Sequence, residues 1–253
     1  MNNHGHLITG ICSFAGLLNH STETQMNRIL PTLLLLFFAT VAQAHFPWMV
    51  VDKEGNVEYF FGEGMTDRTY KLPAGVAGAE IAMCDGSATK PVETETVETD
   101  DFVGKRSVST VPTTADLISQ VTFGVYHGAK LQYYTQHLGG KMPAAFSDCT
   151  PFEKMDLQAH AVDTEGGVDV YVLWQGKPLV DAEVRLFCDE GHEEGNATTG
   201  EDGKVSFNDK EVEDGINAIM VGHTVTGETG KVGDQEYSSA MHYLTATFYD
   251  PED

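Results

Sequence analysis

Short runs in which apolar and polar residues alternate dominate the sequence from about residue 45 onward, and helical periodicity is nearly absent. The clearest run is Val168–Trp174, in which every second side chain (168, 170, 172 and 174) is apolar. A period of two places these apolar side chains on one face of a β-strand. Clusters of Gly, Asp and Pro separate the runs, as is typical of turns. The sequence therefore predicts an all-β fold.

The alternating runs predict strands in both halves of this region. The expected strands lie at 46–51, 57–62, 79–84, 102–109, 118–127, 130–136, 155–161, 168–174, 182–186, 205–207, 216–223 and 240–249. The break at Asp148–Pro151 predicts a domain boundary. Each half has roughly 100 residues, which is enough to bury a core of its own. We expect two tandem Ig-like or transthyretin-like β-sandwich domains, at 45–150 and 151–253.

The first 44 residues have the pattern of an export signal. A short positive region at Met26–Arg28 precedes the almost wholly apolar run Leu30–Val41, and Ala42-Gln43-Ala44 has the small-x-small form that signal peptidase cuts after. The apolar run is shorter than the roughly 20 residues of a membrane-spanning helix. We therefore expect residues 26–44 to be a signal peptide, preceded by an upstream extension at 1–25. Cleavage after Ala44 would give a periplasmic or secreted protein that begins at His45.

The chain is strongly acidic, with 38 Asp and Glu against 15 Lys and Arg and a formal net charge of −23. The expected cleavage removes only Glu23 and Arg28 from these totals, so the net charge is unchanged. Such a surface repels nucleic acid and anionic lipid and attracts cations. No second apolar stretch after His45 has spanning length. We expect no nucleic-acid partner and no membrane span in the mature chain.

Three cysteines remain after cleavage, Cys84, Cys149 and Cys188. In an oxidising compartment they allow at most one disulfide. The sequence has no CxxC motif and no Cys/His cluster with zinc-finger spacing. We expect a structural or incidental role for all three.

His45 has special chemistry if it is the first residue of the mature chain. Its α-amine and its ring Nδ1 can chelate one metal ion, and a second imidazole completes the arrangement called a histidine brace. This nitrogen ligand set suits Cu(II) and Ni(II). The alternative is that His45 is only the residue that happens to follow the cleavage site.

His223 and His242 are the best candidates for further ligands. His223 ends one predicted strand and His242 begins another, and each lies on an apolar-leaning face. If the two strands pair antiparallel, residues directly opposite have Cβ atoms about 5 Å apart. We interpret Thr224–Ser238 as a long loop between them, of a length that is often functional. The alternative is two core-edge histidines, each bonded to a backbone carbonyl.

The other histidines are weaker candidates. His127 lies at a predicted hairpin tip, on the same strand face as Val121 and Val125, and is a less favoured ligand. We expect ordinary surface or edge positions for the remaining three, which are His137, His160 and His192.

Several short motifs resemble a family of secreted bacterial proteins. In chain order they are His45-Phe46-Pro47-Trp48-Met49-Val50, Tyr59–Glu63, Tyr126–Tyr134, Val170–Leu179 and Met241–Thr247. The family was formerly described as NikM-like, a domain of unknown function associated with nickel uptake. The resemblance implies an exported two-domain β protein linked to nickel or cobalt handling, with histidines at positions 45, 223 and 242.

A second resemblance concerns the fold of the C-terminal half alone. Gly176-x-Pro178-Leu179, followed by Thr199-x-x-Asp202-Gly203, resembles transthyretin-like and carboxypeptidase-regulatory-like sandwich modules. The turn glycines explain this pattern physically, so it specifies a fold rather than a function.

These observations favour an exported protein that captures or delivers nickel, cobalt or copper. The partners are then the metal ion and an envelope metal transporter. One alternative is a copper monooxygenase that uses the histidine brace, and another is an envelope adhesion or interaction module without metal. The sequence contains neither Gly-x-Ser-x-Gly nor HExxH, and we assign no catalytic residues.

Overall fold

The computed structural model describes residues 45–85 and 88–250. The predicted upstream extension (1–25) and signal peptide (26–44) lie outside the described residues. Strands make up 59% of the structure and helices 3%, so the prediction of an all-β fold is confirmed. The helices described are α1 (Ala74–Ala77) and the 3-10 helix η1 (Phe146–Asp148). In this part of the chain, no helix has the length and apolar character that crossing a membrane requires.

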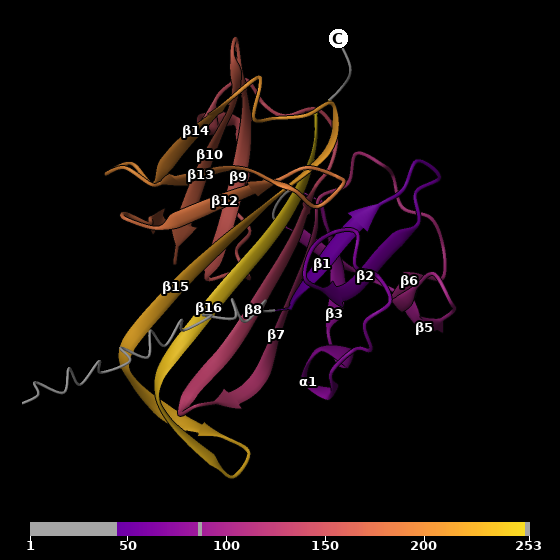
Figure 1. The fold of residues 1–253 in the computed structure, drawn as a ribbon, viewed down its shortest axis with the longest axis vertical. Coiled ribbons are helices and arrows are strands. Elements are labelled where there is room, and N and C mark those ends of the chain that lie inside the picture. Colours follow the sequence, from indigo (N-terminus) through magenta and orange to yellow (C-terminus); the bar gives the residue numbers. More distant parts are fainter. Residues whose placement is uncertain (1–44, 86–87, 251–253) are drawn as a thin grey trace, which may run out of the picture. The chain divides into compact units, whose positions relative to one another are not determined.

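The described strands follow the chain as labelled in Figure 1. They are β1 (Phe46–Val51), β2 (Val57–Gly62), β3 (Glu80–Asp85), β4 (Ala88–Val92), β5 (Thr94–Glu98), β6 (Val103–Ser107), β7 (Leu117–Tyr126), β8 (Ala129–Leu138), β9 (Leu157–Thr164), β10 (Gly167–Trp174), β11 (Lys177–Pro178), β12 (Glu183–Phe187), β13 (Glu193–Thr198), β14 (Lys204–Asn208), β15 (Gly215–Val232) and β16 (Gln235–Asp250).

These strands form three sheets. An eight-stranded sheet has the order β13-β12-β15-β16-β8-β7-β3-β4, and a four-stranded sheet has the order β1-β2-β6-β5. In the third sheet, β10 pairs with β9 on one edge and with β11 and β14 on the other. Figure 1 shows β15 and β16 as long strands that run beside β8 and β7 in the eight-stranded sheet.

The eight-stranded sheet contains strands from both halves of the chain. β8 and β16 lie on opposite sides of the expected boundary at Asp148–Pro151, yet they pair in parallel from Ala129↔Ser239 to Leu138↔Phe248. The described residues belong to one compact unit. The two halves therefore share one sheet. The division into separate domains at 45–150 and 151–253 stays a prediction.

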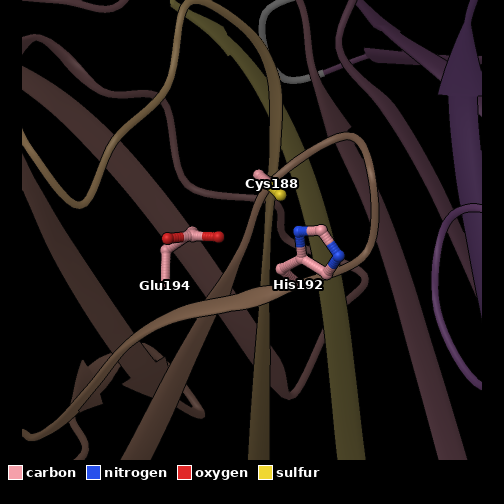
Figure 2. Close-up of side chains that lie close together, drawn as sticks. All are labelled: Cys188, His192 and Glu194. Atoms are coloured by element: carbon pink, nitrogen blue, oxygen red, sulfur yellow. The ribbon is translucent and has the colours of Figure 1, made fainter.

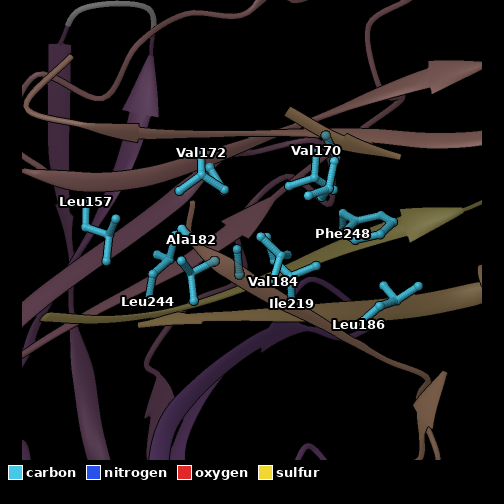
Figure 3. Close-up of a cluster of buried hydrophobic side chains, with 14 of the residues drawn as sticks. Leu157, Val170, Val172, Ala182, Val184, Leu186, Ile219, Leu244 and Phe248 are labelled. Atoms are coloured by element: carbon cyan, nitrogen blue, oxygen red, sulfur yellow. The ribbon is translucent and has the colours of Figure 1, made fainter. Parts of the chain in front are cut away.

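Each face of the eight-stranded sheet packs against one of the smaller sheets. Leu244, Ala246 and Phe248 of β16 belong to a core with residues of β9, β10, β12 and β14 (Figure 3). The alternate residues of β16 face β1 instead, where the hydroxyls of Thr245 and Thr247 donate hydrogen bonds to backbone carbonyls of β1. The middle strands are therefore covered on both faces.

The segment Thr224–Ser238 is not a loop, and that interpretation was wrong. β15 continues to Val232, and β16 begins at Gln235 after a tight turn in which Gly233 has a φ of 58°. The register shifts between Thr226 and Gly230, so the intervening residues form a β-bulge. A positive φ suits glycine, and a bulge absorbs extra residues without ending the strand.

Candidate metal centre

His223 and His242 lie directly opposite each other in the β15–β16 ladder, which confirms the predicted pairing. Their ring centroids are 6.4 Å apart. The indole of Trp174, at the end of β10, contacts both rings, with centroid distances of 4.7 Å to His223 and 4.5 Å to His242. The two imidazoles therefore share one apolar cover from the neighbouring sheet.

The hydrogen bond to Tyr134 fits one tautomer of His242. Its Nδ1 lies 3.1 Å from the hydroxyl oxygen of Tyr134 on β8. The tautomer protonated at Nδ1 donates this hydrogen bond to Tyr134. The other ring nitrogen, Nε2, then has an unprotonated lone pair.

His242 Nε2 is buried and has no hydrogen-bond partner among the described residues. The whole residue is only 3% exposed. A buried polar atom without a partner costs roughly 1–3 kcal/mol, and such atoms are few in native proteins. This nitrogen is therefore the feature of the site that most requires an explanation.

The bulge in β15 brings a carboxylate to the same nitrogen. Glu228 lies within the bulge, and its Oε2 is 3.9 Å from His242 Nε2. Its Oε1 accepts a hydrogen bond of 2.5 Å from Lys130 Nζ. The hydrogen bond from Lys130 is the main cause that lowers the pKa of Glu228, so this carboxylate is ionised at neutral pH.

Both histidines of the pair are neutral at neutral pH. Burial lowers the pKa of His242 to about 4, and the positive charge of Lys130 acts in the same direction. Burial also lowers the pKa of His223, which is less deeply enclosed. Neutral imidazole is the form that binds metal ions.

The structure does not bring His45 to this pair. His45 Nε2 lies 3.8 Å from Glu63 Oε1, and its ring contacts Tyr70 and Phe61 at centroid distances of 3.9 Å and 5.8 Å. The next residue, Phe46, packs against the side chain of Tyr243. Tyr243 and His242 are adjacent on β16 and therefore point to opposite faces of the sheet.

His127 also lies apart from the pair. It is exposed at the β7–β8 turn with a φ of 49°, and its ring contacts Tyr126 at 4.2 Å. His242 pairs with Gln132, five residues further along, which corresponds to about 16 Å of strand. In the part of the chain that the structure describes, no group of three ligand atoms within 4.8 Å of one another contains His45, His127, His223 or His242.

The expectation of surface or edge positions is wrong for two of the remaining histidines. His137 and His160 are each 4% exposed, and burial lowers the pKa of each to about 4. His160 stacks on Phe152, with centroids 5.2 Å apart and an interplanar angle of 2°. His192 is exposed, as expected. The two buried residues have polar partners of their own, since His137 bonds to Thr247 and His160 to Gln158.

Sequence reasoning missed the residues that complete the surroundings of the pair. The sequence pattern indicates only a core position for Trp174, and it does not indicate a role at the site for Tyr134, Asp156 or Glu228. Tyr134 has the strand parity of a core residue, so only the parallel pairing of β8 with β16 reveals its contact with His242. Glu228 reaches the site because of the bulge, and the three glycines within residues 227–233 are the one sequence signal that indicates an irregular strand there.

Two comparisons with known proteins find no counterpart for this chain. No protein-family model matches the sequence, and no curated protein matches it either. The geometry of the site is therefore the basis for proposing a function.

Proposed function

We propose that the chain binds one divalent transition-metal ion, Cu(II), Ni(II) or Co(II), through His242 Nε2, His223 and Glu228. The observation that carries this proposal is the buried Nε2 lone pair of His242, which faces an ionised carboxylate and lies opposite a second neutral imidazole. A bound ion would satisfy the nitrogen and offset the cost of burying it.

The surroundings of His242 resemble those of metal-binding histidines. Such a histidine almost always donates its other ring N–H to a carboxylate, a carbonyl or a water, which fixes the ring and raises its basicity. Here the tautomer of His242 protonated at Nδ1 donates to the hydroxyl of Tyr134, which lies near the charge of Asp156. The half-buried His223 would rotate to complete the ligand set, since its ring lies 6.4 Å from that of His242. Two imidazoles and a carboxylate suit Ni(II), Co(II) and Cu(II) by ligand type.

This ligand set differs from the histidine brace expected from the sequence. The brace needs the α-amine of His45, whose side chain packs against Tyr70 and Phe61. We therefore propose metal capture or delivery rather than brace-type oxygen chemistry. Export after cleavage at Ala44, the kinship with NikM-like proteins and delivery to an envelope metal transporter belong to the same proposal. The negative charge of the chain supports it, because it raises the local concentration of cations.

Fluorescence of Trp174 provides a local test. Cu(II) and Ni(II) quench nearby indoles, and Trp174 contacts both histidine rings. We expect saturable quenching in the full chain and its loss in Trp174→Phe, although Trp48 remains. His242→Ala and His223→Ala should each weaken binding by at least about tenfold. The exposed His127→Ala is the matched control and should bind like the wild type. Equal affinity in His242→Ala and the wild type would refute the proposal.

A further inference from the structure

A second group of possible metal ligands surrounds the loop that joins β12 to β13. Cys188, His192 and Glu194 each offer one ligand atom, and these atoms all lie within 4.8 Å of one another (Figure 2). Cys188 also forms such a group with Asp189 and Glu213. The thiol is therefore the common member of two sets of ligand atoms.

The loop backbone holds the thiol and the imidazole close together. Cys188 N–H donates to His192 O at 3.1 Å, and Gly191 N–H donates to Cys188 O at 3.0 Å. Gly191 has a φ of 83°, which glycine adopts without strain. Burial raises the pKa of the Cys188 thiol, and the backbone of His192 and of Glu190 acts in the opposite direction. The thiol therefore gives up its proton when a metal ion binds.

A β-bulge supplies the carboxylate. The β12–β13 register runs from Leu186↔Gly195 to Phe187↔Glu193, so Glu194 has no partner residue on β12. Glu193 forms an ion pair with Arg185, whereas the carboxylate of Glu194 lies within 4.8 Å of the thiol of Cys188. Bulges often re-aim a side chain toward a functional site.

The buried side-chain amide of Asn217 fixes the backbone of Glu213. Asn217 is 0% exposed, and its side chain accepts a hydrogen bond from Glu213 N–H and donates one to Glu213 O. The Glu213 backbone is therefore fixed next to β15, which pairs with β12 at Phe187↔Ala218. Because Cys188 follows Phe187 directly, this pairing brings Glu213 close to Cys188.

We infer that Cys188, His192 and Glu194 form a second metal site, which takes Zn(II) and is independent of the histidine pair. Thiolate, imidazole and carboxylate are the three ligand types of protein-bound zinc. The two negative charges of thiolate and carboxylate balance the charge of the ion. When the sulfur–metal bond forms, the thiol proton leaves to solvent and the metal keeps its oxidation state. Asp189 and Glu213 each have a ligand atom within 4.8 Å of the Cys188 sulfur and are the candidates for the fourth ligand of a tetrahedral site.

Co(II) replaces Zn(II) in such sites and reports sulfur ligation directly. We expect a thiolate-to-Co(II) charge-transfer band in the near ultraviolet when the full, reduced chain is titrated with Co(II), and we expect Zn(II) to displace it. Cys188→Ser should abolish the band. His192→Ala and Glu194→Gln should each weaken Co(II) binding by at least about tenfold. His192 is exposed, so His192→Ala tests the site even if Cys188→Ser fails to fold.

Matched variants separate this site from other sulfur and histidine ligands. Cys84→Ser and Cys149→Ser remove the two other free thiols among the described residues and should leave the band unchanged. The double variant His223→Ala/His242→Ala should also retain it, even though it loses the quenching of Trp174. The inference is overturned if the wild type gives no band at saturating Co(II), or if the band survives in Cys188→Ser. Unchanged affinity in both His192→Ala and Glu194→Gln would be equally decisive against it.

Discussion

The two ends of the β8–β16 ladder each bury one histidine, and the two residues differ in how their ring nitrogens are used. At one end, His137 Nδ1 donates to the Thr247 hydroxyl at 2.8 Å, and that hydroxyl donates to Met49 O at 2.7 Å. At the other end, His242 Nδ1 is bonded to Tyr134, but Nε2 has no partner among the described residues. The hydrogen bonds of His137 and Thr247 therefore join two sheets, whereas one ring nitrogen of His242 is left without a partner.

This difference shows that burial alone does not identify a ligand. Both residues are less than 5% exposed, and burial lowers the pKa of both to about 4. Both imidazoles are therefore neutral and chemically able to bind metal. What distinguishes His242 is an unsatisfied atom that faces a carboxylate and a second imidazole, whereas His137 is already committed to holding β1 against the sheet.

The largest expected effect is on stability at acidic pH. The folded pKa of His137 is about 4 against 6.5 for the ordinary side chain, so between these values the unfolded chain binds the proton and the folded chain does not. Stability is therefore full above pH 6.5 and falls as the pH drops toward 4, by on the order of 3 kcal/mol for one such histidine. Urea unfolding of the metal-free chain at pH 7 and pH 4.5 measures this loss. His137→Leu should lose less between the two pH values, and an identical loss would contradict the assignment.

The next effect is on the bonds between the sheets. Thr247→Val keeps the size of the side chain but removes the hydroxyl, which leaves His137 Nδ1–H and Met49 O without this partner. Two unsatisfied groups should lower the free energy of unfolding by about 2–3 kcal/mol. Quenching of Trp174 by Cu(II) should be unchanged, because Thr247 points to the opposite face from His242. A shift of the metal affinity in Thr247→Val would mean that the two ends are coupled.

A smaller effect is expected at the partner of His242. Tyr134→Phe removes the hydroxyl that forms the hydrogen bond of 3.1 Å with His242 Nδ1. The ring is then less firmly oriented, and we expect metal affinity to fall by about tenfold. Tyr133→Phe is the matched control, because Tyr133 points to the other face of β8 and contacts Phe46. Equal losses in the two variants would argue against a specific role for Tyr134.

Local patterns in the sequence predicted most of the strands and the register at the histidine pair. The bounds expected for β1 and β2 agree with the structure, and the parity of β16 correctly placed His242 on the same face as Leu244. Strands β4, β11 and β13, which were not predicted, lie at the edges of their sheets. Edge strands are largely solvated, so alternation of apolar and polar residues is not required of them.

The rest of the site depends on contacts between distant segments. Parallel pairing of β8 with β16 places both strands in the middle of the eight-stranded sheet, and the smaller sheets cover its two faces, so His137 is buried and is not an edge residue. Because β1 packs on the face opposite to His242, His45 and His242 lie on opposite sides of this sheet. No local pattern encodes either result, because both depend on which strands meet across more than 100 residues of sequence.

The smallest expected effect best distinguishes a structural histidine from a metal ligand. It is measured by replacing each buried histidine by leucine in the metal-free chain. His137→Leu breaks a satisfied hydrogen bond to Thr247 and should lower the free energy of unfolding at pH 7 by about 1 kcal/mol. His242→Leu removes the unpartnered Nε2 and loses one hydrogen bond, the one to Tyr134. We therefore expect its stability to be unchanged or up to about 1 kcal/mol higher, as is typical of a residue kept for binding rather than for stability. Adding Cu(II) should then stabilise the wild type and His137→Leu but not His242→Leu. If His242→Leu is instead the more damaging variant without metal, the His242 end of the ladder is structural.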